Sequence, residues 1–258
     1  MKLANATALV TGANRGIGAA IAERLADAGV AQLLCGVRDP SKHEPPPGAR
    51  CVRMDMSTRE SIEQSCAELG AQLGRIDLLV NNAGLMSGGL LEQQEPADLY
   101  AMFQVNLVGV AHLTARVLPG MLERGHGKIV NNASISGYAH LPGATTYAAS
   151  KAGVVALTES LRRELRGTGV STLHLITPGV DTAMLDDTEE VYGRHMDTSA
   201  WERQEPAEWA RRVVAAIERD DRTLSPGGRI GWAVRASHGP PILLDALSAR
   251  IFSRVPRR

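Results

Sequence analysis

The sequence predicts a doubly wound α/β fold, in which helices cover both faces of one parallel sheet. Short apolar runs alternate with longer amphipathic stretches, as strands and helices do in such folds. Glycine-rich or polar residues follow several of the runs, at the strand ends where ligands bind. The predicted strands are 6–10, 33–37, 51–54, 76–80, 127–131 and 170–176. The predicted helices are 19–28, 58–73 (capped by Thr58), 96–117, 147–166 and 206–219.

Length and composition fit one globular domain over residues 1–258. Of the 258 residues, 44% are hydrophobic and 3% aromatic, so the core is built mainly of small and aliphatic side chains. Twenty-eight basic residues balance twenty-eight acidic ones, which argues against a nucleic-acid partner. Cys35, Cys51 and Cys66 lack the spacing of metal ligands. We therefore expect reduced thiols in a cytoplasmic protein without a metal site.

Neither a secretory signal nor a membrane span is expected. The chain goes almost directly into its first predicted strand. No apolar run approaches the ~20 residues of a spanning helix. Residues 242–252 carry an apolar helical face and precede a basic tail. Core packing or subunit contact is the favoured role of that segment, and peripheral membrane binding is the alternative.

A glycine-rich loop, 11–18, stands between the first predicted strand and the first predicted helix. Its glycines, Gly12, Gly16 and Gly18, have the spacing Gly-x-x-x-Gly-x-Gly. Free backbone N–H groups at a helix N-terminus attract phosphate. The strand–loop–helix order therefore favours nucleotide binding over a plain tight turn.

Two arginines indicate which dinucleotide the loop would hold. The group that reads the adenosine ribose is expected about 20 residues past the glycines, and Val37 and Arg38 stand there in place of an acid. Arg15 lies inside the loop itself. Two guanidiniums favour a 2′-phosphate, and hence NADP(H) over NAD(H), unless both are solvated surface side chains.

The segment 134–151 contains three side chains that could share a proton-transfer site. Tyr147 and Lys151 are four residues apart on a predicted helix, so they lie on one face. An ammonium near a phenol lowers the pKa of the phenol toward working pH. Ser134 follows a predicted strand at its carboxyl end. A Tyr and a Lys at this spacing are commonly a surface pair, but Ser134 and the glycine loop favour a functional site.

Two segments near the C-terminus depart from the alternating pattern. Residues 183–205 turn polar and are expected to form a substrate loop or lid. Residues 225–258 form an atypical extension that begins with Ser225-Pro226-Gly227-Gly228.

Together these motifs resemble the short-chain dehydrogenase/reductase family, and especially its NADP-preferring, carbonyl-reductase-like members. The matching residues are Thr11-Gly12-x-x-x-Gly16-x-Gly18, Asp55, Asn81-Asn82-Ala83-Gly84, Asn106, Ser134, Tyr147-x-x-x-Lys151 and Pro178-Gly179. They occur in the family's order over about residues 6–182, some two thirds of the chain. The resemblance implies a single Rossmann-like domain that assembles as a homodimer or homotetramer.

The resemblance also implies a role for each catalytic residue. Tyr147 would be the general acid that protonates the substrate oxygen, and the general base in the reverse direction. Ser134 would hydrogen-bond that oxygen and stabilise its charge. Lys151 would lower the pKa of Tyr147 and bond the nicotinamide ribose. Asn106 would hold a water that links Lys151 to solvent.

A cofactor site follows from the same resemblance. The residues expected to bind NADP(H) are Gly12, Asn14, Arg15, Gly16, Ile17, Gly18, Arg38, Asp55, Met56, Asn82, Ala83, Gly84, Tyr147, Lys151, Pro178, Gly179, Val180 and Thr182. Thr182 lies one residue closer to Pro178 than in many members, and the usual final strand ending in Asp-Gly-Gly is not found. Asn131 and Asn132 are expected to be structural.

The activity expected from these residues is NADPH-dependent carbonyl reduction, or alcohol oxidation in reverse, on a small to medium organic substrate. Leu85, Met86, Leu141 and the 183–205 segment would line an apolar substrate pocket. Dehydration or epimerisation by the same Tyr–Lys pair is the alternative among enzymes. A non-catalytic NADP(H)-binding sensor or scaffold is the alternative from another class, although it would not need all four catalytic side chains.

Overall fold

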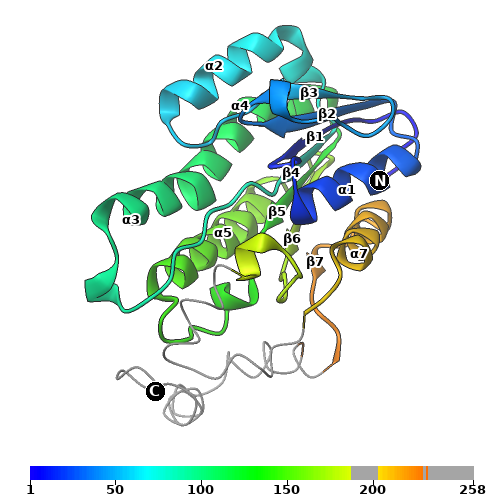
Figure 1. Cartoon of the computed structure of the whole chain (residues 1–258). Coiled ribbons are helices and arrows are strands. Elements are labelled where there is room, and N and C mark those ends of the chain that lie inside the picture. The colour runs from blue at the N-terminus through cyan, green and yellow to red at the C-terminus, as the bar shows by residue number, and fades with distance from the viewer. Residues whose placement is uncertain (187–202, 229–230, 232–258) are drawn as a thin grey trace.

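A computed structural model describes residues 1–186, 203–228 and 231. The centre is a seven-stranded parallel sheet in the order β3-β2-β1-β4-β5-β6-β7 (Figure 1). From β1 the chain adds β2 and β3 toward one edge of the sheet, and it then adds β4 to β7 toward the other edge. Open α/β sheets bind their ligands at such a switch in strand order, here between β1 and β4. The strands are β1 (Thr7–Thr11), β2 (Gln32–Val37), β3 (Ala49–Arg53), β4 (Leu78–Asn81), β5 (Gly127–Asn132), β6 (Val170–Leu175) and β7 (Thr223–Leu224).

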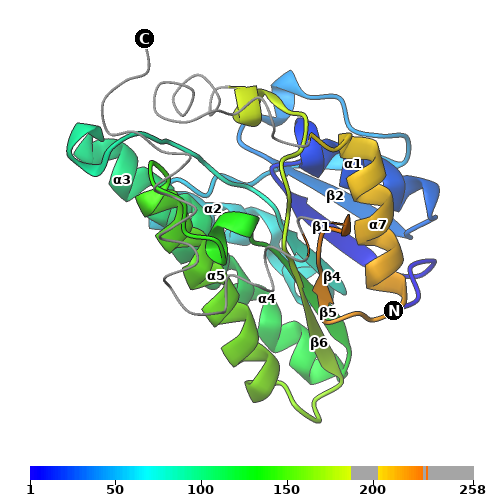
Figure 2. The same cartoon turned by 90° about the horizontal axis from the view of Figure 1, so that it is seen from below.

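Helices cover both faces of this sheet (Figures 1 and 2), which confirms the predicted fold class. The helices are α1 (Gly16–Asp27), α2 (Arg59–Leu69), α3 (Pro96–Phe103), α4 (Gly109–Arg124), α5 (Thr145–Glu164) and α7 (Pro206–Glu218). On one face α1 and α7 pack side by side, and on the other lie α2, α4 and α5. Ile21 and Trp209 are fully buried in the first core, and Leu113 and Ile129 in the second.

The ends of α2 explain why the predicted helix 58–73 is shorter in the structure. Thr58 caps the helix as predicted, because its hydroxyl accepts a 3.0 Å hydrogen bond from the N–H of Ser61. The hydroxyl of Ser61 accepts in return from the N–H of Thr58 at 3.2 Å. Gly70 follows Leu69 with a φ of +52°, and the chain continues as a 3-10 turn. This conformation is open to glycine and ends the α-helix.

The helices α3 and α4 form one continuous run, Pro96–Arg124, with a π-helical turn at Gln104–Val108. By length and composition alone this run could cross a membrane. Half of the most apolar 18-residue stretch of this run is buried inside the protein, however. Val117 and Met121, which belong to this run, pack into the core, so the run packs as a core helix against the sheet.

The last strand corrects another expectation from the sequence. β7 pairs in parallel with β6, so the sheet does have a final strand, although this strand is only two residues long. Pro226 follows closely and has no N–H with which to extend the ladder. Much of the two predicted C-terminal segments lies outside the described residues, namely 187–202, 229–230 and 232–258.

Candidate active site

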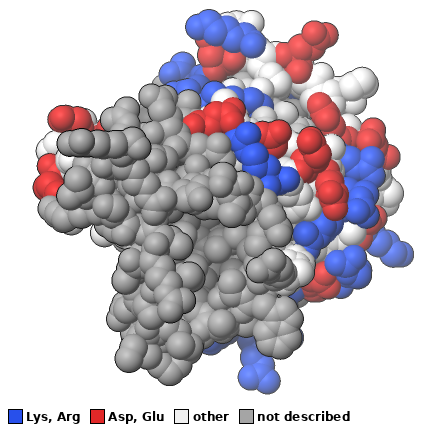
Figure 3. Space-filling view, turned by 60° about the horizontal axis from the view of Figure 1, so that its bottom comes forward, with Lys and Arg blue, Asp and Glu red and all other residues white. Residues whose placement is uncertain are grey.

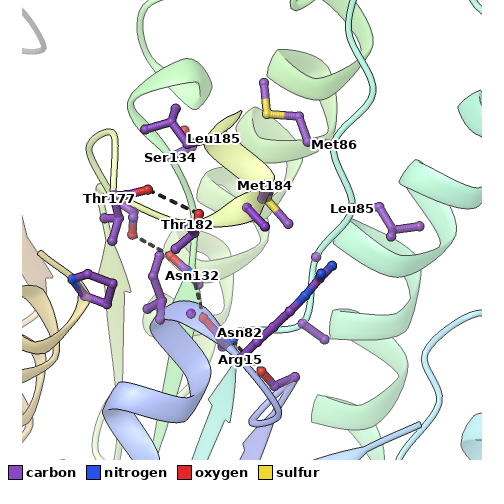
Figure 4. A pocket seen from close by; sticks show the side chains of 18 of the residues that line it. Arg15, Asn82, Leu85, Met86, Asn132, Ser134, Thr177, Thr182, Met184 and Leu185 are labelled. Atoms are coloured by element: carbon purple, nitrogen blue, oxygen red, sulfur yellow. Dashed lines mark hydrogen bonds between the residues drawn. The ribbon is translucent and has the colours of Figure 1, made fainter. Parts of the chain in front are cut away.

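A cavity of about 1330 Å³ lies along the carboxyl ends of the strands (Figure 4). It is bordered by the glycine loop, by the ends of β2 to β5 and by the segment that follows β6. Every catalytic or cofactor residue predicted from the sequence lines this cavity except Gly18 and Asn106. The chain therefore brings motifs from seven separate stretches to one site.

The glycine loop is packed so tightly that side chains are excluded. A Cβ on Gly18 would lie 2.2 Å from the carbonyl oxygen of Gly12 and 2.4 Å from Nδ2 of Asn82. Gly18 thus lets α1 approach the loop from behind rather than lining the cavity. Helix α1 begins at Gly16, and no side chain caps its first turn. The free N–H groups at this helix end suit a pyrophosphate, so the loop fits the predicted dinucleotide.

A chain of side-chain hydrogen bonds joins the loops above four strands. Asn82 donates from Nδ2 to the carbonyl oxygen of Thr11 at 3.1 Å and accepts from Nδ2 of Asn132 at 3.0 Å. Thr177 donates from its hydroxyl to Oδ1 of Asn132 at 2.5 Å. Two of these bonds are drawn in Figure 4. Asn132 therefore lines the cavity and holds Asn82 and Thr177 in place there. The structural role expected from the sequence did not include a place in the cavity.

The neighbouring Asn131 has only the structural role expected of it. Its side chain is buried, accepts from Nδ2 of Asn81 at 2.8 Å and donates to the hydroxyl of Thr158 at 2.9 Å. Alternation along β5 explains the contrast, because successive side chains of a strand point to opposite faces. The position of Asn132 at the end of β5 is the sequence signal for its role at the site.

Ser134, Tyr147 and Lys151 meet at the end of β5, as predicted. Tyr147 and Lys151 lie on α5 with 9% and 5% of their surfaces exposed. The hydroxyl of Ser134 is close enough to the Tyr147 side chain to lower the pKa of the phenol. Nζ of Lys151 lies 5.8 Å from the centre of the Tyr147 ring and donates a 2.7 Å hydrogen bond to the carbonyl oxygen of Asn132.

Burial controls the charges of this pair. It raises the pKa of Tyr147 above its ordinary value, although the neighbouring Ser134 hydroxyl lowers that pKa in part. It lowers the pKa of Lys151 to about 8. That Lys151 lowers the pKa of Tyr147 stays a prediction, since burial is the largest influence on the phenol in this structure and raises its pKa. The phenol is consequently protonated at neutral pH, the form in which it can donate a proton.

Asn106 lies behind the cavity wall, in the π-helical turn. Its Oδ1 accepts from the N–H of Leu85 at 2.8 Å, and its Nδ2 donates to the carbonyl oxygen of Leu85 at 2.8 Å and to the hydroxyl of Ser150 at 3.1 Å. A π-helical turn shifts a side chain out of helical register, and such turns are frequent at functional sites. Asn106 thus fixes the segment that carries Gly84 past Lys151.

The adenosine end of the cavity is bordered by exposed basic side chains. Arg15 extends into the cavity in Figure 4, and Arg38 lines it after β2. The nearest acid in sequence, Asp39, accepts from the N–H of Ser41 at 3.1 Å and pairs with Lys42 at 3.1 Å. The carboxylate of Asp39 is therefore held by Ser41 and Lys42 of its own turn.

Two further residues that were predicted to bind the cofactor, Asp55 and Thr182, also line the cavity. Asp55 accepts from the N–H of Ser57 at 3.0 Å at the end of β3. Thr182 lines the cavity, donates to the carbonyl oxygen of Val180 at 3.2 Å and lies against Gly16. The shorter spacing after Pro178 still brings Thr182 to the glycine loop.

The opposite end of the cavity is apolar. Leu85, Met86 and Leu141 line it as predicted, joined by Met184 and Leu185 from the start of the 183–205 segment. This end adjoins Tyr147, so a substrate bound there would place an apolar group against these side chains.

Comparison with known proteins gives the family. A family model described as short chain dehydrogenase matches residues 6–192, well over half of the chain. The chain belongs to the short-chain dehydrogenase family. This membership confirms the resemblance, the oxidoreductase class and the nicotinamide cofactor predicted from the motifs.

Individual relatives agree with the family. The chain is similar to an uncharacterised oxidoreductase of Staphylococcus saprophyticus, with 35% identity over 84% of this chain and 93% of that protein. It is also similar to a 3-oxoacyl-(acyl-carrier-protein) reductase of Haemophilus influenzae, with 37% identity over 67% of this chain and 72% of that protein. A short chain dehydrogenase from Burkholderia cenocepacia in complex with NADP has a TM-score of 0.82 and 26% identity, over 96% of this chain and 99% of that one.

Proposed function

We propose that this family member is an NADP(H)-dependent carbonyl reductase, or alcohol dehydrogenase in reverse, for small to medium organic substrates. The observation that carries the proposal is the meeting of Ser134, Tyr147 and Lys151 in the lining of one cavity, with Nζ of Lys151 5.8 Å from the centre of the Tyr147 ring. Bound NADPH would supply the hydride that reaches the carbonyl carbon. The protein must then supply a proton to the oxygen and an environment that stabilises the developing negative charge.

Tyr147 is the proton donor in this scheme. Burial keeps its phenol protonated at neutral pH, so the hydroxyl can give its proton to the carbonyl oxygen as the alcohol forms. Ser134 reaches the same oxygen from the other side and hydrogen-bonds it. In the oxidation direction the phenolate would take the proton back.

Lys151 positions groups around that donor. Its Nζ donates to Asn132, which leaves further N–H groups for the ribose of the cofactor. Its ammonium also stabilises the phenolate left after proton donation. We propose that Asn106 holds the Leu85 segment beside Lys151. The water relay expected from the sequence would then pass along the cavity wall formed by that segment.

The cofactor preference rests on the adenosine end. Arg15 and Arg38 both line the cavity there, while the carboxylate of Asp39 is held by its own turn. Guanidiniums pair well with a phosphate, whereas NAD-binding relatives of this fold need an acid for the ribose hydroxyls. The Burkholderia cenocepacia structure was determined in complex with NADP, which supports the same preference.

The substrate end supports an apolar carbonyl compound. Leu85, Met86 and Leu141 would cover the group attached to the carbonyl carbon. A 3-oxoacyl group is one such carbonyl, in agreement with the name of the Haemophilus influenzae relative. On the described surface in Figure 3, basic and acidic side chains are interspersed, which suits a small-molecule partner better than nucleic acid.

We propose a cytoplasmic homodimer or homotetramer. Tyr100 on α3 is 80% exposed, and Val108 and Leu122 on the α3–α4 run are also exposed, so this face offers apolar surface for a subunit contact.

The proposal also treats 1–258 as one domain, with 183–205 as a substrate lid and 225–258 as an extension.

The function is tested by initial rates with purified protein. NADPH and NADH are compared against a panel of aldehydes, ketones, diketones and 3-oxoacyl thioesters. Turnover that favours NADPH supports the proposal. Tight NADPH binding with no turnover across the panel would favour the sensor or scaffold.

A further inference from the structure

Two loops line the substrate end of the cavity and form two of its walls. The loop after β4 provides Leu85 and Met86, and the loop before α5 provides Leu141 and Ala144. Neither loop belongs to the sheet: Asn106 holds the first loop at Leu85, and contacts between the two loops hold the part beyond it. The separation of the two loops sets the room available to the apolar group of a substrate.

Hydrogen bonds join these walls at one place. The N–H of Gly89 donates to the carbonyl oxygen of Gly143 at 3.0 Å. The side chain of Gln94 makes two further bonds: its Oε1 accepts from the hydroxyl of Thr146 at 2.7 Å, and its Nε2 donates to the carbonyl oxygen of Gly89 at 3.4 Å. We call Gln94, Thr146, Gly89 and Gly143 the Gln94 latch.

The latch is sheltered and adjoins the proton donor. Thr146 is only 7% exposed, so its hydroxyl depends on Gln94 for a partner away from bulk water. It directly precedes Tyr147 in the first turn of α5. Gln94 thus reaches from the wall of Leu85 to the residue beside the catalytic phenol.

We propose that Gln94 is a positioning residue that determines substrate specificity by fixing the separation of the two apolar walls. It does not line the cavity itself and acts through Thr146 and Gly89. A fixed separation favours substrates whose apolar group fills it and disfavours both smaller and bulkier ones. The inference rests on the proposed carbonyl reduction, because it assigns the discrimination at that same site.

The test compares Gln94→Met with Gln93→Met. Both substitutions keep the length of the side chain, but Gln93 is exposed and lies outside the latch. Thr146→Val removes the other partner at nearly constant shape. KM and kcat are measured for ketones of increasing size, from butanone to aryl ketones, together with the Kd for NADPH.

We expect Gln94→Met to raise KM for the best ketone about three- to tenfold, as loss of one or two hydrogen bonds predicts. Preference among ketone sizes should flatten, while kcat and the Kd for NADPH stay within about twofold. Gln94→Met and Thr146→Val combined should cost no more than Gln94→Met alone, because the bond that Thr146→Val removes is already lost in Gln94→Met. Gln93→Met should behave like the wild type.

Amide hydrogen exchange gives a second readout that does not need turnover. The Gly89 amide should exchange about three- to tenfold faster in Gln94→Met than in Gln93→Met, because its partner on the other wall is less well held. Unchanged exchange, or an unchanged ketone profile in an active enzyme, would overturn the role of Gln94. If the wild type reduces no carbonyl, the proposed function fails, and the exchange rate of Gly89 alone decides whether the latch exists.

Discussion

Nζ of Lys151 donates a 2.7 Å hydrogen bond to the carbonyl oxygen of Asn132. The same asparagine donates to Asn82 and accepts from Thr177 through its side chain. One residue at the end of β5 therefore joins the proton-transfer site to the loops that border the cofactor cavity. This arrangement makes Asn132 a point at which cofactor binding and catalysis can be disturbed together.

Asn132→Ala should weaken both functions. The change leaves the backbone acceptor of Lys151 in place but removes the bonds to Asn82 and Thr177, each worth about 1 kcal/mol. We expect the Kd for NADPH to rise about tenfold or more, with a fall in kcat. Fluorescence titration and initial rates measure the two effects, with the exposed Asn5→Ala as control. A Kd within about twofold of the wild type would show that Asn132 is dispensable.

The pH profile of reduction should reflect Lys151. Burial lowers the pKa of Lys151 to about 8, below the ordinary value of 10.5. The ammonium is therefore present below pH 8 and is lost above it, before the phenol of Tyr147 titrates. We expect kcat/KM for carbonyl reduction to fall about tenfold per pH unit above roughly pH 8. A rate that stays level to pH 10 would contradict this assignment.

Arg38 should be responsible for the preference of the enzyme for NADPH over NADH. Arg38→Leu removes one charge-assisted partner of a 2′-phosphate, worth about 1.5–3 kcal/mol. We expect kcat/KM for NADPH to fall about 10- to 100-fold, while kcat/KM for NADH changes little. The control is Arg53→Leu, because Arg53 is exposed on the adjacent β3 but does not line the cavity. Equal losses with both cofactors would mean that Arg38 does not read the phosphate.

Gly18 should tolerate no side chain. In Gly18→Ala the new methyl group would overlap the carbonyl oxygen of Gly12, so α1 must shift from the loop. We expect a loss of unfolding free energy of about 1–3 kcal/mol and weaker NADPH binding. Gly74→Ala is the matched control, since nothing lies within 4 Å of a Cβ there. Thermal unfolding and NADPH titration compare the two, and equal behaviour would refute the close packing.

The site residues that could be predicted are marked by short sequence patterns, such as a fixed spacing next to a strand or within a helix. Gly12 and Gly18 have a fixed spacing between a strand and a helix, and Tyr147 and Lys151 are one helical turn apart. Such patterns can be recognised without knowing which strands are neighbours. The same holds for Ser134, which directly follows a strand.

Other relationships depend on contacts that the sequence does not reveal. The bond between Asn132 and Asn82 forms because β5 pairs with β4 in a register that aligns Asn131 with Asn81. Gln94 meets Thr146 across 52 positions, through two loops without periodicity. The pKa of Tyr147 likewise depends on burial, which the spacing to Lys151 could not indicate.

The central claim is that Tyr147 donates the proton in carbonyl reduction, and Tyr147→Phe tests it most directly. The measurement is kcat for the best ketone together with the Kd for NADPH. We predict a loss of at least about 100-fold in kcat with little change in Kd, because general acid catalysis is worth that much and only the hydroxyl is removed. Turnover close to that of the wild type, with NADPH bound equally well, would contradict the assignment.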